Sequence, residues 1–116
     1  PVIENSNFKI RGFNNPPNSL GLLLFADTSS LSGIDPYGLG ILMHVDLPGS
    51  QWFTYADFVS DSTGSAIFPM SLVGTASVIG LQIQIQSIWN WAGLGLCMPS
   101  TSGLSSSNGI EMTILP

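Results

Sequence analysis

Few residues in this chain could do chemistry, and the first pair to consider is His44 with Asp46. Side chains at positions i and i+2 of a β-strand point to the same face, so this pair could contribute to a metal site. His44 is the only histidine in the sequence. One imidazole and one carboxylate are too few ligands for a metal ion. We therefore predict a solvated or hydrogen-bonded pair and no metal site.

Two further motifs match catalytic sequences only in part. DSTG at 61–64 contains the residue types of an aspartic-protease triplet, but two residues separate Asp61 from Gly64. Asp, Ser and Gly are also the residues that a hairpin connection needs. Serines are abundant, yet there is no Gly-x-Ser-x-Gly elbow and no Gly-rich phosphate loop between a strand and a helix. The sequence predicts a turn here, no catalytic residue, no cofactor and a protein that is not an enzyme.

The tryptophans could form a platform on which sugar rings stack. Trp89 and Trp91 share a face if their strand continues through Asn90, and Trp52 lies in another predicted strand. The alternative is packing in the core or in an interface, because aromatic side chains bury large areas. We favour that alternative.

Short strand signals separated by Gly, Pro and Ser position these residues. The run 20–27 is continuously apolar, as in a strand buried on both faces, and no segment has helical periodicity. The chain is short enough for one domain over 1–116. We predict an all-β antiparallel β-sandwich, immunoglobulin-like or jelly-roll-like, with long loops at 28–40 and 93–109. The predicted strands are 7–13, 20–27, 41–46, 51–59, 67–72, 81–89 and 110–115.

The stretch LQIQIQSIW at 81–89 alternates branched apolar residues with glutamines. In a strand, this pattern places the apolar residues on one face and a row of amides on the other. We predict that the apolar face belongs to the core. The predicted core residues are Phe8, Ile10, Leu22, Leu24, Leu81, Ile83, Ile85, Ile110, Met112 and Ile114.

The chain carries little charge. Charged residues make up 8% of it, against roughly 25% in ordinary soluble proteins, and the formal net charge is −5. Lys9 and Arg11 are the only basic residues, which argues against nucleic-acid binding. No apolar run approaches the roughly 20 residues that span a bilayer.

Most strand edges lack the charged residues that usually prevent pairing with another chain. The neutral glutamines Gln82, Gln84 and Gln86 can be buried without the cost of desolvating a charge, so we predict that they face a neighbouring subunit.

Residues 1–13 form a segment that could be exchanged between subunits. Phe8 and Ile10 alternate with the two basic residues, and NNPPNS at 14–19 could act as a hinge. Strand addition to a neighbour would use Phe8 and Ile10 as anchors at the subunit interface. An ordinary strand pairing within its own chain is the alternative, which we slightly favour.

Two further features of the sequence are its first residue and its single cysteine. The chain begins at Pro1, which we interpret as a processed product or a fragment. Cys97 is predicted to be a buried thiol or, alternatively, to form an intermolecular bridge.

The order of several segments resembles a C-terminal β-sandwich domain that recurs in predicted secreted proteins of planctomycetes and related bacteria. The matching segments are NNPPNSLGLLLFADTSS, GILMHVDLPG, SDSTGSAIFPMSL, VIGLQIQIQSIW and GLSSSNGIEMTI. The resemblance implies a β-sandwich and an extracellular or cell-surface location. It includes no catalytic signature and does not indicate an activity.

Two functions follow as hypotheses. The first is a secreted structural protein that assembles with copies of itself into an extracellular filament or layer. The alternative is a module of a larger secreted protein that uses Trp52, Trp89 and Trp91 to bind polysaccharide or to attach to a surface. The low charge favours the first, because a subunit that buries most of its surface has little use for charged side chains.

Overall fold

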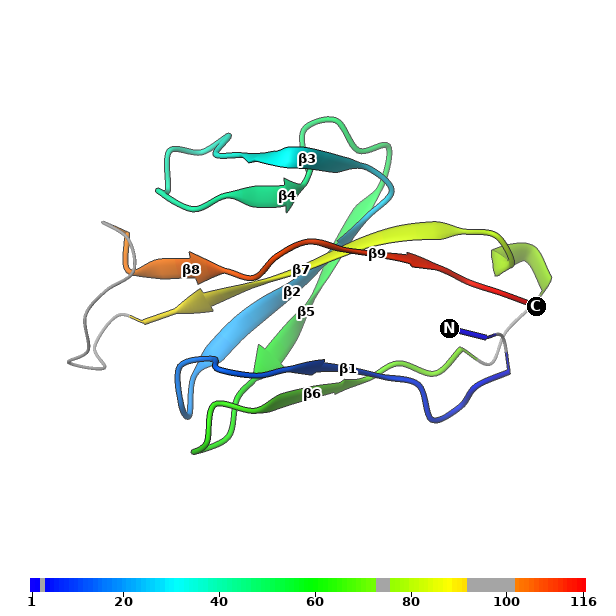
Figure 1. The fold of residues 1–116 in the computed structure, drawn as a ribbon, viewed down its shortest axis with the longest axis horizontal. Helices are drawn as coiled ribbons and strands as arrows, with labels where there is room; N and C mark the ends of the chain where they lie inside the picture. The colour runs from blue at the N-terminus through cyan, green and yellow to red at the C-terminus, as the bar shows by residue number, and fades with distance from the viewer. Residues whose placement is uncertain (3, 73–75, 92–101) are drawn as a thin grey trace.

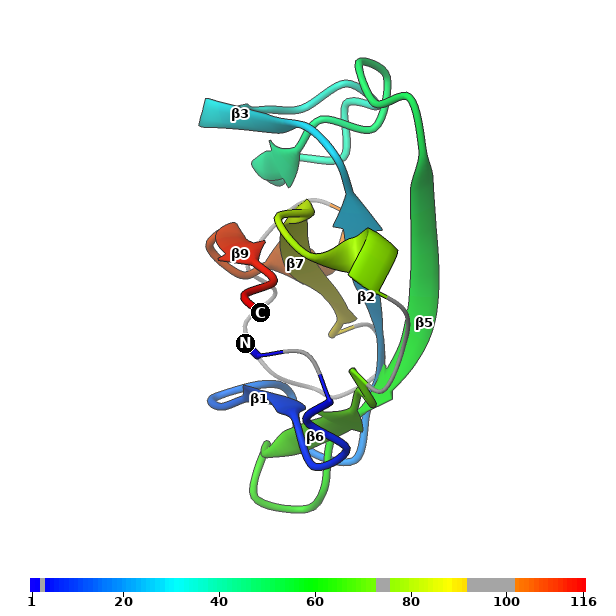
Figure 2. The ribbon, with the colours of Figure 1, turned by 90° about the vertical axis from the view of Figure 1, so that its right-hand side faces the viewer.

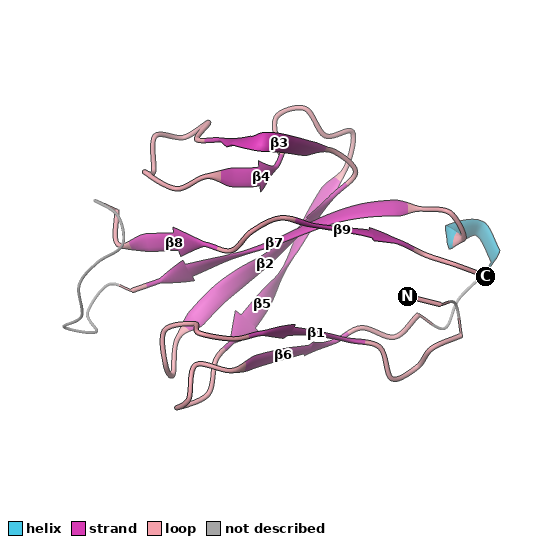
Figure 3. Cartoon of the chain, viewed as in Figure 1, coloured by secondary structure: helices cyan, strands magenta, loops and turns pink. Residues whose placement is uncertain are grey.

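Nine strands and one short 3-10 helix are present in the computed structural model, which describes residues 1–2, 4–72, 76–91 and 102–116. Cys97 lies outside the described residues. The all-β prediction is confirmed, and Figure 3 shows strands throughout the chain. The elements are β1 (Lys9–Gly12), β2 (Leu20–Ala26), β3 (Ser29–Ile34), β4 (Met43–Val45), β5 (Phe53–Val59), β6 (Ala66–Pro69), η1 (Ala76–Val78), β7 (Gln82–Asn90), β8 (Leu104–Ser106) and β9 (Ile110–Thr113).

A five-stranded antiparallel sheet forms the centre of the fold. Its order is β5-β2-β7-β8, and β9 pairs with β7 on the same side as β8 (Figure 1). The continuously apolar β2 lies between β5 and β7, as its sequence predicts. A strand in this position needs apolar side chains on both faces, because both faces can be covered.

Two small two-stranded sheets, of which β3–β4 is a hairpin, cover opposite faces of this central sheet. The pair β3–β4 packs on one face and the pair β1–β6 on the other, so the arrangement resembles a sandwich with a layer on each side (Figures 1 and 2). We call the first the hairpin face and the second the core face. The hairpin face carries a small buried cluster of Leu24, Ile41 and Met43.

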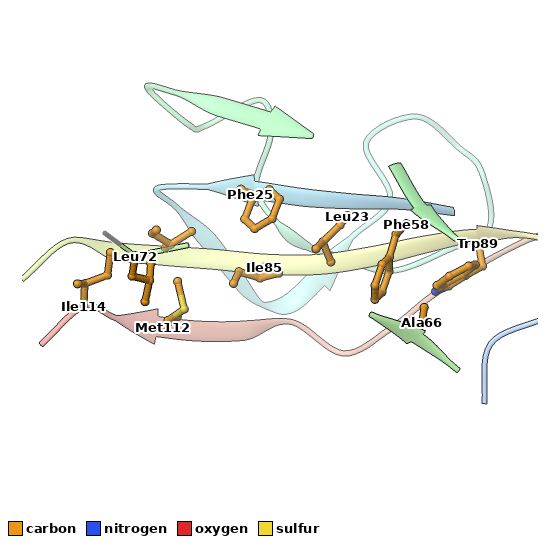
Figure 4. Packing of buried hydrophobic residues seen from close by; sticks show 10 residues of the cluster. Leu23, Phe25, Phe58, Ala66, Leu72, Ile85, Trp89, Met112 and Ile114 are labelled. Atoms are coloured by element: carbon orange, nitrogen blue, oxygen red, sulfur yellow. The ribbon is translucent and has the colours of Figure 1, made fainter. Parts of the chain in front are cut away.

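The main core lies between the central sheet and β1–β6. Ile83, Ile85, Met112 and Ile114 are buried in it, as predicted. Figure 4 shows Ile85, Met112 and Ile114 in this cluster. Phe8 and Ile10 are half-buried and pack against this cluster. The buried members of the cluster are Leu23, Phe25, Phe58, Ala66, Leu72, Ile83, Ile85, Trp89, Met112 and Ile114.

Several of the predicted core positions differ in the structure. Leu24 is buried, but in the smaller cluster on the hairpin face. The predicted burial of Leu22, Leu81 and Ile110 is wrong, because all three side chains are exposed. Leu22 lies on a part of the hairpin face that none of the described segments covers, while Leu81 precedes β7 and Ile110 begins β9.

The two segments predicted as long loops each contain a strand. β3 falls inside 28–40 and β8 inside 93–109, although Ser and Gly dominate both sequences. Both are short strands held by pairing with a neighbour, β4 for β3 and β7 for β8. Their tertiary partners override their weak local preference for strand.

The first strand pairs within its own chain. β1 is antiparallel to β6, with Ile10 opposite Phe68 and Gly12 opposite Ala66. Pairing within the same chain was the alternative to exchange of the first strand between subunits. Phe8 and Ile10, predicted as interface anchors, point into the core of the same chain.

Candidate functional site

The glutamine row of β7 has a different role at each position. Gln86 is 1% exposed, so the prediction that it faces a neighbouring subunit is wrong. Its Oε1 accepts from the His44 N–H at 2.8 Å and the Val45 N–H at 3.3 Å. Its Nε2 donates to the carbonyls of Leu42 at 2.9 Å and Ser107 at 2.7 Å. The amide is therefore saturated, and it ties β4 and the segment after β8 to the central sheet.

The other two glutamines lie toward the start of β7. Gln84 is also buried, which corrects the prediction for this residue, and its Nε2 donates to Glu111 Oε2 at 2.8 Å on the neighbouring β9. Gln82 is exposed. The row thus passes from solvent into the interior because β3–β4 covers its far end, and only Gln82 keeps a surface position.

The structure separates the three tryptophans. Trp89 is 2% exposed and packs against Phe58 with ring centroids 5.2 Å apart, and its Nε1 donates to Ser87 Oγ. Trp91 is half-buried against the same core and donates to Ser105 Oγ at 2.7 Å. Trp89 therefore packs in the core, as we favoured, and it cannot be the glycan contact of the alternative function. Trp52 alone has substantial exposure, at 37%.

His44 and Asp46 do not form a site together. His44 Nδ1 lies 3.3 Å from the Ser30 carbonyl, whereas Asp46 Oδ1 accepts from the Gly49 N–H in a turn. His44 instead borders a polar cleft of about 300 Å³ that Gln84 and Glu111 also line. Within the described residues, no group of three or more His, Cys, Asp or Glu side chains could hold a metal ion.

The DSTG motif forms the predicted turn. Asp61 Oδ1 accepts from the backbone N–H groups of Thr63 and Ser65 and from Thr63 Oγ1, and Gly64 has a positive φ of 75°. The hydrogen bond from the Thr63 side chain, followed by the two backbone bonds, lowers the pKa of Asp61. An exposed, locally satisfied carboxylate of this kind stabilises a turn.

A strip of apolar side chains on the hairpin face is the least ordinary surface of the chain. In the β2–β5 register, Leu20 lies opposite Val59, Leu22 opposite Asp57, and Ala26 opposite Phe53. Residues opposite each other in an antiparallel pair share a face, so the exposed members form one strip. Tyr55 is 64% and Val59 61% exposed. The apolar strip consists of Leu20, Leu22, Phe53, Tyr55 and Val59.

The strip is bare because the covering hairpin lies over the other half of the sheet. Gln86 ties β4 to β7, and the small cluster beneath the hairpin includes Leu24 and the half-buried Ile88. Figure 2 shows β5 at the right-hand boundary of the molecule, with no described layer beyond it. Sequence reasoning missed the strip. The sequence does carry a pattern that indicates the strip. Within 51–59, large apolar residues stand at alternate positions, with Thr, Ala and Asp among them.

The fold also has a groove between the central sheet and β6. This apolar groove of about 400 Å³ lies beside β5 and is lined by Trp52 and Tyr55, with Phe25 and Ile83 from the central sheet and Phe68 from β6.

No helix among the described residues is long and apolar enough to cross a membrane, since η1 has three residues. Comparison with protein-family models, with curated proteins and with solved structures finds no match for this chain.

Proposed function

We propose that the protein is a non-enzymatic structural subunit that associates with copies of itself, through the apolar strip, into an extracellular filament or layer. The observation that supports this proposal is the strip itself. Its five large side chains lie on one face of β2 and β5, with Asp57 between Tyr55 and Val59, and each is exposed. Contiguous apolar surface on a protein is typical of interaction sites, unlike apolar residues scattered singly.

The energetics of association favour this surface over the rest of the chain. Fully burying a large aliphatic or aromatic side chain contributes roughly 1.5 to 3 kcal/mol. Asp57 is the only charged side chain in β5, so covering the strip desolvates few charges. Several side chains buried together would offset part of the translational and rotational entropy that association costs. The extracellular location is also part of the proposal, and it rests on the sequence resemblance.

Carbohydrate binding is the alternative function, and of the three tryptophans it now depends on Trp52, together with Tyr55. Trp52 and Tyr55 are exposed and line the same groove beside β5. Aromatic rings at the rim of a groove can stack on sugar rings. This alternative predicts a monomer whose affinity for a glycan is lost in Trp52→Ala.

Sedimentation velocity over a range of protein concentrations, with electron microscopy of the same samples near neutral pH, tests the proposal. We expect concentration-dependent association that is lost in the double variant Leu20→Lys and Val59→Lys, which places charge on neighbouring strands of the strip. Leu31→Lys is the control, because Leu31 is a 96% exposed leucine on β3, outside the strip. A wild-type protein that stays monomeric at all concentrations would contradict the proposal.

A further inference from the structure

We propose that two copies of this chain pair edge to edge through β5, antiparallel, with Tyr55 on the two-fold axis. This inference rests on the proposed function and specifies the contact by which assembly starts. It depends on which backbone groups of β5 already have partners.

Only alternate residues of β5 use their backbone groups to pair with β2. The Ser60 N–H donates to the Ser19 carbonyl, so residues 60, 58, 56 and 54 direct their N–H and C=O groups toward β2. Residues 53, 55, 57 and 59 therefore direct theirs away from the sheet. β5 pairs with no other strand along this edge, apart from an isolated bridge at Ser60–Ala66, within the part of the chain that the structure describes.

That bridge defines how much of the edge is open. Ser60 pairs with Ala66, and the Asp61 N–H donates to the Ser65 carbonyl, so the start of β6 lies beside the end of β5. The edge next to Val59 is therefore occupied by the same chain. Phe53, Tyr55 and Asp57 remain as three alternate positions whose outward backbone groups have no partner among the described residues.

Three open positions fix one symmetric register. In a two-fold antiparallel pair centred on residue 55, position 55+n lies opposite position 55−n of the other copy. Tyr55 then faces Tyr55 of the partner subunit, and Phe53 faces Asp57 of the partner subunit. If the two-fold axis passed through any other residue of β5, at least one of the three open positions would lie opposite a residue that is not open. The register around Tyr55 is therefore the one that satisfies all of the open backbone groups.

Side-chain chemistry also favours this register. The two Asp57 carboxylates lie four residue positions apart, roughly 13 Å at the rise of a strand, so they do not oppose each other. Two Tyr55 rings meet across the strands, an arrangement that stabilises antiparallel pairs. The apolar strips of both copies then lie side by side on one face of a continuous sheet. This wider apolar face could pack against another pair, which extends the assembly.

Two other strand edges, at β1 and at the end of β9, are less suited to pairing. β1 carries Lys9 and Arg11, the only basic residues of the chain, on its outer positions. The end of β9 is already covered, because Val2 bridges to Leu115 and the Leu115 N–H donates to the Pro1 carbonyl. β5 has no Lys, Arg or Pro, the residues that usually guard an edge strand.

Thiol crosslinking in a Cys97→Ser background tests the register. Residues opposite each other in a hydrogen-bonded antiparallel pair have Cα atoms about 5.5 Å apart, within the roughly 4.4 to 6.8 Å that a disulfide spans. Tyr55→Cys alone should therefore form a disulfide-linked dimer on mild oxidation. Phe53→Cys alone and Asp57→Cys alone should stay uncrosslinked, whereas an equal mixture of the two should give a heterodimer. All three side chains are exposed, so the variants should fold, which circular dichroism checks.

The outcomes separate this inference from the proposed function. The register is supported if Tyr55→Cys forms dimers, and if Phe53→Cys and Asp57→Cys crosslink only when the two variants are mixed. Association by sedimentation without these crosslinks, or with crosslinks of Phe53→Cys to itself, overturns the β5 pairing and leaves assembly through the apolar strip standing. A chain that sediments as a monomer at all concentrations overturns both.

Discussion

Replacing Gln86 with methionine should destabilise the fold more than the same change at Gln84 or Gln82. Methionine has nearly the length and volume of glutamine, so the change removes hydrogen bonds without creating a large cavity. The three residues alternate along one strand face, which makes the other two natural controls. The expected order of cost is Gln86, then Gln84, then Gln82.

The magnitude follows from the partners that Gln86 would leave behind. The Leu42 carbonyl keeps a hydrogen bond from Ser106 Oγ at 2.8 Å, and Ser107 is exposed, so its carbonyl can bind water. The N–H groups of His44 and Val45 lose the acceptor that they share, and Val45 is fully buried. An unsatisfied buried group costs about 1 to 3 kcal/mol, so we expect a loss of roughly 2 to 4 kcal/mol for Gln86→Met.

The controls have smaller expected losses for stated reasons. Gln84 makes one hydrogen bond, to the carboxylate of the exposed Glu111, which water can replace, so Gln84→Met should cost about 1 kcal/mol or less. Gln82 is exposed, and its replacement should change stability by less than about 0.5 kcal/mol.

Urea unfolding followed by tryptophan fluorescence measures the three losses, and hydrogen exchange at the amides of His44 and Val45 reports whether β4 detaches. The reasoning would be refuted by equal losses at the three positions, or by protection of those two amides that is unchanged in Gln86→Met.

The remaining predictions concern the core and the DSTG turn. Ile83→Ala should cost roughly 2 to 5 kcal/mol in urea unfolding, because Ile83 is buried, whereas Ile110→Ala should cost less than about 1 kcal/mol, because Ile110 is exposed although it lies opposite the buried Ile85 on the same face. Equal losses at the two sites would contradict the burial of Ile83 and the exposure of Ile110. An NMR pH titration should give Asp61 a pKa below the ordinary value of an aspartate. Because folding favours the ionised form, the stabilisation by Asp61 is present above about pH 4 and is lost as the pH falls through the folded-state pKa, and Asp61→Asn should weaken this pH dependence. An Asp61 that titrates at or above the ordinary value would contradict the hydrogen-bonding pattern of the turn.

The sequence predicts the strands that carry their own signal. The apolar run of β2 and the alternation in β7 are strong local patterns, and both strands lie at the centre of the sheet. β3 and β8 have no such pattern, since Ser and Gly are common in both, and they exist because a neighbouring strand offers hydrogen-bonding partners. Periodicity therefore identifies strands that the core selects, and it misses strands that pairing alone supports.

The candidate site was less predictable, because a strand pattern specifies two faces without saying what covers each one. In the register, Ala26 lies opposite Gln84 on one side and Phe53 on the other, and the same hairpin face is covered over β7 and bare over β5. The position of the β3–β4 hairpin decides the difference, and that position depends on contacts between segments far apart in the sequence, such as Gln86 with His44.

The glutamine row and the apolar strip are therefore two consequences of one arrangement. A covering hairpin brings backbone N–H groups into the interior, and a buried amide with two donors and an acceptor can satisfy them where an apolar side chain cannot. Polar residues are thus required under the hairpin, at Gln86, while apolar residues remain on the uncovered half, at Tyr55 and Val59. On the hairpin face, Gln86 is buried while Tyr55 and Val59 are exposed, the opposite of the usual expectation that amides face solvent and branched or aromatic residues face the core. The uncovered apolar half is where a second copy would gain most from binding.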